Sequence, residues 1–431
     1  MTPSSAGRPD APSPPPAAAP NGQKRGLVLL AAFLGWMFDG LEMGIFPLVA
    51  RPALQQMQSA AGGGATDAFV GHWMGIITAL FLVGAALGGL VFGWLGDRVG
   101  RVRAMSLSIL CYSVFTGLAY FAQVPWHLGL SRFLAALGMG GEWSLGVALV
   151  MEVWPERHRP LLAGVIGAAA NVGFALIGII GIWFHVTRES WRFVLLIGAL
   201  PAVLTFLIRL FVPESERWQH AASASPDRQP LREILSSHHL KATLLATALC
   251  AIALIGTWGS VQWLPLWADQ LTGGTVPAAK AVTTLFAGIG AIAGCLLGGW
   301  MGGRFGRRAT YFGLCLGSLL ACAAMFRLIP GYGAPFLATT FVVGALTAAF
   351  YGWFPLYLPE LFPTRIRATG QGLAFNAGRI FAAIGALQMG SLMQLFAGSY
   401  ARAGAVITLV YGLGLVLIWF APETRGRPLP E

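Results

Sequence analysis

Long apolar runs of about 20 residues follow one another along almost the whole chain, from Gly26 to Pro422. A helix of that length crosses the roughly 30 Å hydrocarbon core of a bilayer, and the runs lack the alternation of barrel strands. The pattern predicts an all-α membrane protein with twelve transmembrane helices. The expected spans are 26–49, 73–95, 104–123, 128–153, 161–185, 191–212, 241–268, 279–302, 310–328, 334–358, 370–395 and 403–421.

The polar positions between the runs predict the orientation, because loops rich in arginine and lysine stay in the cytoplasm. The basic set of alternate loops is Arg8, Lys24, Arg25, Arg98, Arg101, Arg103, Arg157, Arg159, Arg217, Arg228, Arg232, Lys241, Arg304, Arg307, Arg308, Arg365, Arg367, Arg425 and Arg427. The opposite loops carry Arg51, Arg188, Lys280, Arg327 and Arg402. Both termini are therefore expected in the cytoplasm, and a multi-pass protein of the cell inner (plasma) membrane is predicted.

Composition supports this interpretation, with 56% hydrophobic residues, 10% charged residues and a mean hydropathy of +0.68. The formal net charge of +11 is read as a topology signal and not as nucleic-acid binding. The first 25 residues, rich in Pro, Ala and Ser, are expected to be a disordered cytoplasmic tail without a cleaved signal peptide. The five cysteines fall inside predicted spans without metal-ligand spacing, so no metal, cofactor or enzymatic activity is expected.

Three pairs of similar segments recur at an offset of about 206 to 209 residues, and they mark an internal repeat. The pairs are WLGDRVGRVR (94–103) with WMGGRFGRRA (300–309), EVWPERHR (152–159) with ELFPTRIR (360–367), and PESER (213–217) with PETRG (422–426). A parallel repeat of two six-helix bundles can rock about a central site. The predicted domains are a tail (1–25), an N-terminal bundle (26–212), a cytoplasmic linker (213–240), a C-terminal bundle (241–421) and a tail (422–431).

With these motifs, the chain resembles the major facilitator superfamily of transporters over roughly 26–427. The loop GDRVGRVR, the segment RFLAALGMGG (132–141) and the PESER and PETRG endings resemble the sugar porter and organic-acid proton symporter branches. DGLE (39–42) is similar to the acid-Gly-x-acid signature of the organic-acid branch, which includes sialate, monocarboxylate and aromatic-acid transporters, with Glu42 where Asp is more usual. The resemblance implies two pseudo-symmetric bundles and alternating access.

The resemblance also implies a gating network at the cytoplasmic surface that latches the outward-facing state. Its residues are Asp97, Arg98, Arg101, Glu152, Arg159, Glu360 and Arg367. Glu152 is expected to pair with Arg159, and Glu360 with Arg367 in the second copy. Gly303 replaces Asp97 there, so a weaker latch is expected in the C-terminal half. Alternatively, these residues only set the topology at the lipid headgroups.

Three buried charges are predicted to couple protons to transport. Asp39 and Glu42 are three residues apart and share a helix face, roughly 15 Å and 10 Å from the outer end of their span. Carboxylates at that depth need a proton or a cation. Arg132 is the nearby cation, and the resemblance to sugar porters implies that it pairs with Asp39. Asp39 is the predicted proton carrier, with Glu42 in reserve, or else the pair only holds two helices together.

Two further charges, Glu142 and Arg379, are predicted at similar depth, roughly 15 Å from the cytoplasmic ends of their helices. A buried arginine with a free fork binds a carboxylate at two points, which favours an organic anion as substrate. Alternatively, Arg379 is neutralised by Glu142 or another internal acid. Asn171, Gln262 and Asn376 are the polar side chains expected to line the same site.

Together these residues predict a secondary active transporter that carries a small organic acid anion with protons by alternating access. A sugar transporter, or a drug or metabolite exporter on the same fold, is the alternative. The expected partners are the small-molecule substrate, protons and the lipid bilayer, with no nucleic acid, and the protein is expected to be a monomer.

Overall fold

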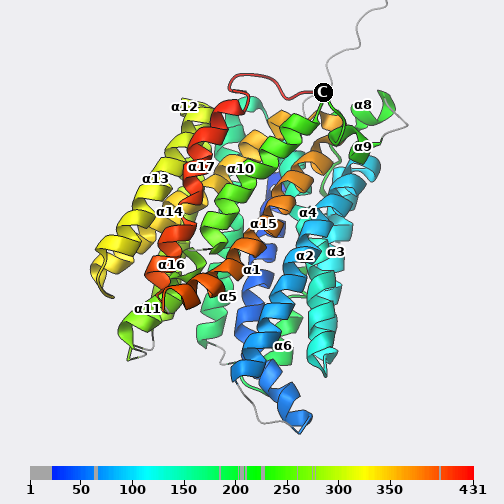
Figure 1. The fold of residues 1–431 in the computed structure, drawn as a ribbon. Coiled ribbons are helices and arrows are strands. Elements are labelled where there is room, and N and C mark those ends of the chain that lie inside the picture. The colour runs from blue at the N-terminus through cyan, green and yellow to red at the C-terminus, as the bar shows by residue number, and fades with distance from the viewer. Residues whose placement is uncertain are drawn as a thin grey trace, which may run out of the picture.

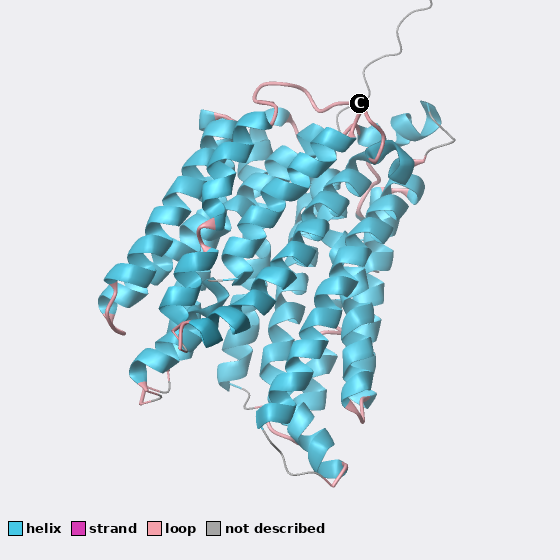
Figure 2. Cartoon of the chain, in the orientation of Figure 1, coloured by secondary structure: helices cyan, strands magenta, loops and turns pink. Residues whose placement is uncertain are grey.

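The computed structural model of the chain describes residues 22–431 except 63–66, 184–185, 202, 204–207, 209–210, 225–228, 260, 274, 277 and 398. Within these ranges the regular elements are α-helices and short 3₁₀ helices, and no strand occurs (Figure 2). Of the described helical segments, ten are long and apolar enough to cross a membrane. The predicted all-α membrane fold is therefore confirmed. Of the twelve expected spans, the sixth (191–212), which lies partly outside the described residues, and the eleventh (370–395) are not among the ten.

The first half of the chain forms the helices α1 (Gly22–Ala60), α2 (Asp67–Val99), α3 (Arg101–Leu118), α4 (Pro125–Val153), α5 (Arg159–Trp183) and α6 (Trp191–Ile197). The helix α1 continues well beyond the expected end at residue 49. Its last turns keep an apolar stripe, since Ala53, Leu54 and Met57 are buried in a cluster with Trp191 of α6. Tertiary packing therefore extends this helix past the membrane-length run.

The second half begins with two short helices of the linker, α8 (Glu216–Ala224) and α9 (Pro230–Ile234). The helices that follow are α10 (Leu240–Gly259), α11 (Leu264–Thr272), α12 (Ala279–Phe305), α13 (Arg307–Leu328), α14 (Ala334–Tyr357), α15 (Arg367–Leu395), α16 (Tyr400–Ile407) and α17 (Val410–Leu417). The helices α8 and α9 lie with the C-terminus at one end of the bundle, at the top of Figure 1. We call this end the linker end; the arginine pattern predicts that it faces the cytoplasm.

Most helices pack on other helices of their own half, and the two halves meet at two helix–helix junctions (Figure 1). In the first half, α4 packs on α2 and α3, and α1 packs on α5; in the second, α12 packs on α14, and α10 on α15. The helix pairs α2–α15 and α5–α12 join the halves. Small residues allow this approach: an added Cβ at Gly93 would lie 2.7 Å from the Ala368 carbonyl oxygen, and one at Gly164 would lie 3.0 Å from that of Cys295.

The repeated loops turn at glycines in equivalent positions. Gly100, between α2 and α3, has a φ of 114°, and Gly306, between α12 and α13, has a φ of 91°. Side-chain-bearing residues rarely adopt this conformation. Each turn is followed by a helix N-terminus that a carboxylate caps: Glu214 accepts the Arg101 backbone N–H (2.9 Å), and Glu423 accepts that of Arg307 (3.0 Å). The two halves therefore repeat their geometry as well as their sequence at the linker end.

Candidate functional site

The two acids of α1 have different partners. Glu42 is buried and forms an ion pair with Arg132 of α4, and Thr116 of α3 donates a hydrogen bond to the same carboxylate oxygen (3.1 Å). The rings of Phe46 and Phe81 enclose the guanidinium, with centroids 5.0 and 4.6 Å from its Cζ. Glu42 and Arg132 therefore neutralise each other in an apolar setting.

The expected pair of Asp39 with Arg132 is not formed. Arg132 lies seven residues into α4, so it is roughly 10 Å from the beginning of that helix. The same arithmetic places Glu42, not Asp39, about 10 Å from the outer end of the first predicted span. The carboxylate one helical turn nearer the outer end is therefore the one that reaches the arginine.

Asp39 lies instead beside Glu142 of α4. Both side chains are buried, at 0% and 2% exposure, and their carboxyl groups interact with each other. No described residue donates a hydrogen bond to any of the four carboxyl oxygens. Gly35 makes room for this arrangement, because an added Cβ there would overlap the Glu142 carboxyl. Two adjacent buried carboxylates repel each other, and one proton held between them would remove the repulsion and give the pair a donor.

Arg379 of α15 forms no ion pair with any described residue, so Glu142 does not neutralise it. The side chain is 7% exposed, its Nη1 atom has no hydrogen-bond partner among the described residues, and its guanidinium carbon lies 5.2 Å from the Phe375 ring centroid. Asp39 is the nearby acid whose charge acts on it at longer range. The arginine thus retains donors near an acid that it does not contact directly.

An aromatic stack connects this arginine to the carboxyl pair. Phe375, which lies against Arg379, stacks on Trp143, the residue next to Glu142, with centroids 4.1 Å apart and an interplanar angle of 20°. Since Phe375 belongs to α15 and Trp143 to α4, the stack crosses between the halves of the chain. Asp39, Glu142 and Arg379 therefore lie around one interhelical centre, to which α1, α4 and α15 contribute.

The three polar residues predicted to line the site, Asn171, Gln262 and Asn376, do not lie together in the structure. Asn376 of α15 is buried and donates to the Gly140 carbonyl of α4 (2.9 Å), so it joins the halves. Asn171 is half-buried, and its amide nitrogen lies 3.9 Å from the Cys295 sulfur of α12. Gln262 is exposed in the 3₁₀ turn Val261–Trp263. The structure therefore brings Asn376 to the interface between the halves and leaves Gln262 at the surface.

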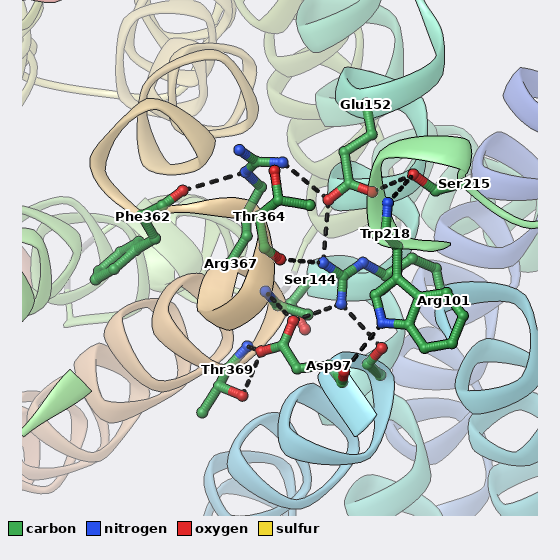
Figure 3. Close-up of polar contacts among 12 residues, drawn as sticks. Asp97, Arg101, Ser144, Glu152, Ser215, Trp218, Phe362, Thr364, Arg367 and Thr369 are labelled. Atoms are coloured by element: carbon green, nitrogen blue, oxygen red, sulfur yellow. Dashed lines mark hydrogen bonds and ion pairs between the residues drawn. The ribbon is translucent and has the colours of Figure 1, made fainter. Parts of the chain in front are cut away.

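A buried network, shown in Figure 3, joins the halves at the linker end. Asp97 of α2 accepts hydrogen bonds from the Thr369 backbone N–H (2.8 Å) and hydroxyl (2.5 Å), both at the beginning of α15. Glu152 of α4 pairs with Arg367 of α15 (2.9 Å) and with Arg101 of α3 (3.1 Å). Arg101 also pairs with Asp97 and donates to the Thr364 carbonyl (2.6 Å). We call Asp97, Arg101, Glu152, Arg367 and Thr369 the latch.

Two ion pairs expected in this network, Glu152 with Arg159 and Glu360 with Arg367, are not formed, and these residues have other partners. Glu152 pairs with Arg367 instead of Arg159, because the first turn of α15 packs across the end of α4. Arg159 pairs with Glu156 (3.2 Å), within its own half. Glu360, expected to pair with Arg367, holds Arg307 through two hydrogen bonds of 2.9 and 2.5 Å.

Arg98, also expected in the network, does not join the latch. It is exposed and lies over the Trp94 ring, with its guanidinium carbon 5.1 Å from the centroid. It is one position removed from Asp97 along α2, so its side chain points to a different side of the helix.

Two hydroxyl donors that were not expected from the sequence complete the network. Ser215 donates to Glu152 (2.5 Å), and Thr424 donates in the same way to Glu360 (2.5 Å). They occupy equivalent places in PESER and PETRG, as do the capping carboxylates Glu214 and Glu423. The repeat of these segments was the signal that could have identified all four residues.

Comparisons with known proteins agree with this architecture. The Major Facilitator Superfamily matches residues 28–386. The chain is 29% identical to a probable 4-methylmuconolactone transporter of Cupriavidus pinatubonensis, over 92% of this chain and 90% of that protein. It is 28% identical to the cis,cis-muconate transport protein of Acinetobacter baylyi, over 93% and 95%. The proton:xylose symporter XylE of E. coli has the same fold, with a TM-score of 0.75, 16% identity and coverage of 95% and 98%. This chain belongs to the major facilitator superfamily of membrane transporters.

Proposed function

We propose that the protein is a proton-coupled symporter of a small organic anion, working by alternating access in a cell inner membrane with both termini in the cytoplasm. The observation that carries the proposal is the state of Arg379, a buried guanidinium with an unused donor and no ion pair among the described residues. A buried uncompensated cation is costly, and a substrate carboxylate supplies both the charge and the acceptor geometry. The relatives named for muconate and muconolactone transport support an organic acid as substrate.

The position of Asp39 explains how proton and anion binding are coupled. When Asp39 and Glu142 carry no proton, the Asp39 charge partly neutralises Arg379 and disfavours a second anion. When a proton enters the carboxyl pair, Asp39 neutralises Arg379 less, and the substrate anion binds the arginine more tightly. Linkage then requires that the anion raise proton affinity by the same factor, typically 5- to 150-fold. Loading the two together is the condition for symport.

The latch supplies the conformational part of the proposed cycle. It holds the halves together at the linker end through charges that belong to both, such as Glu152 with Arg367 and Asp97 with the first turn of α15. These contacts must separate for the central site to open to that end. We therefore assign the latched arrangement to the state in which the site is closed to the cytoplasm.

Counterflow in proteoliposomes tests the choice of substrate class. Labelled muconate, benzoate and glucose are compared for the native protein, Arg379→Gln and the control Arg327→Gln, which changes an exposed arginine at the end of α13. We expect exchange of the anions only, abolished by Arg379→Gln and retained by the control. Glucose exchange that survives Arg379→Gln would instead support the neutral-sugar alternative.

A further inference from the structure

The second junction of the halves, between α5 and α12, contains an arginine-lined pocket at the linker end. Its volume is about 560 Å³. The basic residues that line it are Arg157, Arg159, Arg304, Arg307, Arg425 and Arg427. The acidic residues of the lining are Glu156 and Glu360. Six arginines against two glutamates leave an excess of four positive charges around one cavity.

Both glutamates already form ion pairs with arginines of the lining. Glu156 pairs with Arg159, and Glu360 holds Arg307 through two hydrogen bonds. Arg304, Arg425 and Arg427 are exposed, and within the described residues their guanidinium groups form no ion pair. The pocket therefore presents several free guanidinium forks, without a carboxylate to occupy them.

The internal repeat explains why this junction lacks a counterpart of the carboxylate that joins the halves at the other junction. At the α2–α15 junction, Asp97 accepts the backbone N–H groups of Ala368 and Thr369. The position equivalent to Asp97 is Gly303, and the donors are replaced by Pro160, which has no N–H, and Leu161. An added Cβ at Gly303 would lie 2.6 Å from the Pro160 ring. The α2–α15 junction is thus joined by the buried Asp97 carboxylate. At the α5–α12 junction, Gly303 packs against Pro160 beside the pocket.

We propose that this arginine pocket binds a phosphate group, which supplies the negative charge that Asp97 supplies at the other junction. A guanidinium group can donate two parallel hydrogen bonds to two phosphate oxygens. Several such groups around one cavity favour phosphate, which has more acceptor oxygens than a single carboxylate. Leu161 and Trp300, both more than half exposed, form an apolar part of the lining. The phosphate can therefore arrive on a lipid headgroup from the adjoining leaflet or as a free anion.

A bound phosphate would connect three parts of the chain: the beginning of α5 at Arg159, the end of α12 at Arg304, and the C-terminal segment at Arg425 and Arg427. Because α5 and α12 belong to different halves, such a ligand would stabilise their contact at the linker end. This inference is independent of the substrate and of the proton pathway.

The test uses the full chain in two settings. In nanodiscs, the thermal unfolding midpoint is followed as phosphatidylglycerol replaces digalactosyldiacylglycerol, a neutral bilayer lipid without phosphate. In detergent, inorganic phosphate is titrated at constant ionic strength. The variant Arg304→Gln/Arg427→Gln removes two free forks, and Arg103→Gln/Arg232→Gln removes two exposed arginines outside the pocket lining. At about fivefold per arginine, we expect the pocket variant to lose roughly 25-fold in apparent affinity and the control to change little.

Each outcome decides the proposal. Saturable stabilisation by phosphatidylglycerol alone, lost in the pocket variant, identifies a lipid headgroup, and stabilisation also by inorganic phosphate identifies a free-anion site. An equal loss in both double variants would show general surface electrostatics and overturn the proposal. Absence of saturable stabilisation of the native protein by both probes would overturn it as well.

Discussion

Replacing Glu152 by Gln is expected to release the latch without unfolding either half. In the latched arrangement Arg367 is fully buried, and Glu152 is the described carboxylate with which it pairs. Its remaining contacts, to the carbonyls of Pro359, Phe362 and Pro430, carry no countercharge. Once the halves separate, water can solvate the guanidinium, so the substitution penalises the latched state selectively.

The size of this effect follows from the cost of an uncompensated buried charge. Removing one partner of a buried pair costs about 3–5 kcal/mol, and the glutamine retains an oxygen acceptor, so we take about 3 kcal/mol. That corresponds to a shift of about 160-fold toward the separated arrangement. The control is Glu156→Gln, which breaks the partly exposed pair with Arg159 inside one half and is worth at most about 1 kcal/mol.

Distances between spin labels across the linker end measure the shift. Arg103 and Ala309 are exposed at equivalent places of the two halves and serve as label sites, with the half-buried Cys111 replaced by Ala. Glu152→Gln should move the distance distribution to a longer population, and Glu156→Gln should leave it unchanged. An unaltered distribution for Glu152→Gln, or the same change in the control, would refute the assignment of this carboxylate as the tie between the halves.

Two further substitutions separate structural from coupling roles. Glu42→Gln leaves Arg132 buried without a countercharge, so the denaturation midpoint in detergent should fall, while the proton-to-substrate ratio of the remaining transport should stay the same; a changed ratio would contradict the structural role. Gly35→Ala should displace the Glu142 carboxyl from Asp39, with a large loss of transport and little loss of thermal stability, because the colliding atoms are the end of a flexible side chain. Normal transport by Gly35→Ala would contradict the carboxyl-pair arrangement.

The helices and the repeated turns were predictable because their signals are local. Runs of membrane length fix where helices form, and the glycines of the repeated loops fix where the chain reverses. The membership of Asp97, Arg101 and Glu152 in one polar group was implied by the resemblance of the repeated loops to those of the superfamily. These features need no knowledge of how the halves are packed.

The partners within the polar groups were not predictable from sequence spacing. Arg159 is seven residues from Glu152 and Arg367 is far away in the chain, yet the contact between α4 and α15 selects the distant arginine. Similarly, a difference of one helical turn decides that Glu42 reaches Arg132 while Asp39 meets Glu142. Such choices depend on the relative height and rotation of packed helices, which membrane-length apolar runs do not specify.

Proton movement during substrate uptake tests the central proposal most directly. Proteoliposomes are given a muconate gradient, and the external pH is recorded for the native protein, Asp39→Asn and Glu42→Gln. We expect external alkalinisation by the native protein and by whatever transport Glu42→Gln retains. We expect none by Asp39→Asn, even where muconate exchange persists. Substrate-driven alkalinisation of undiminished size by Asp39→Asn would contradict the proposal, because the coupled proton is held between two carboxyl groups and this variant leaves only one of them.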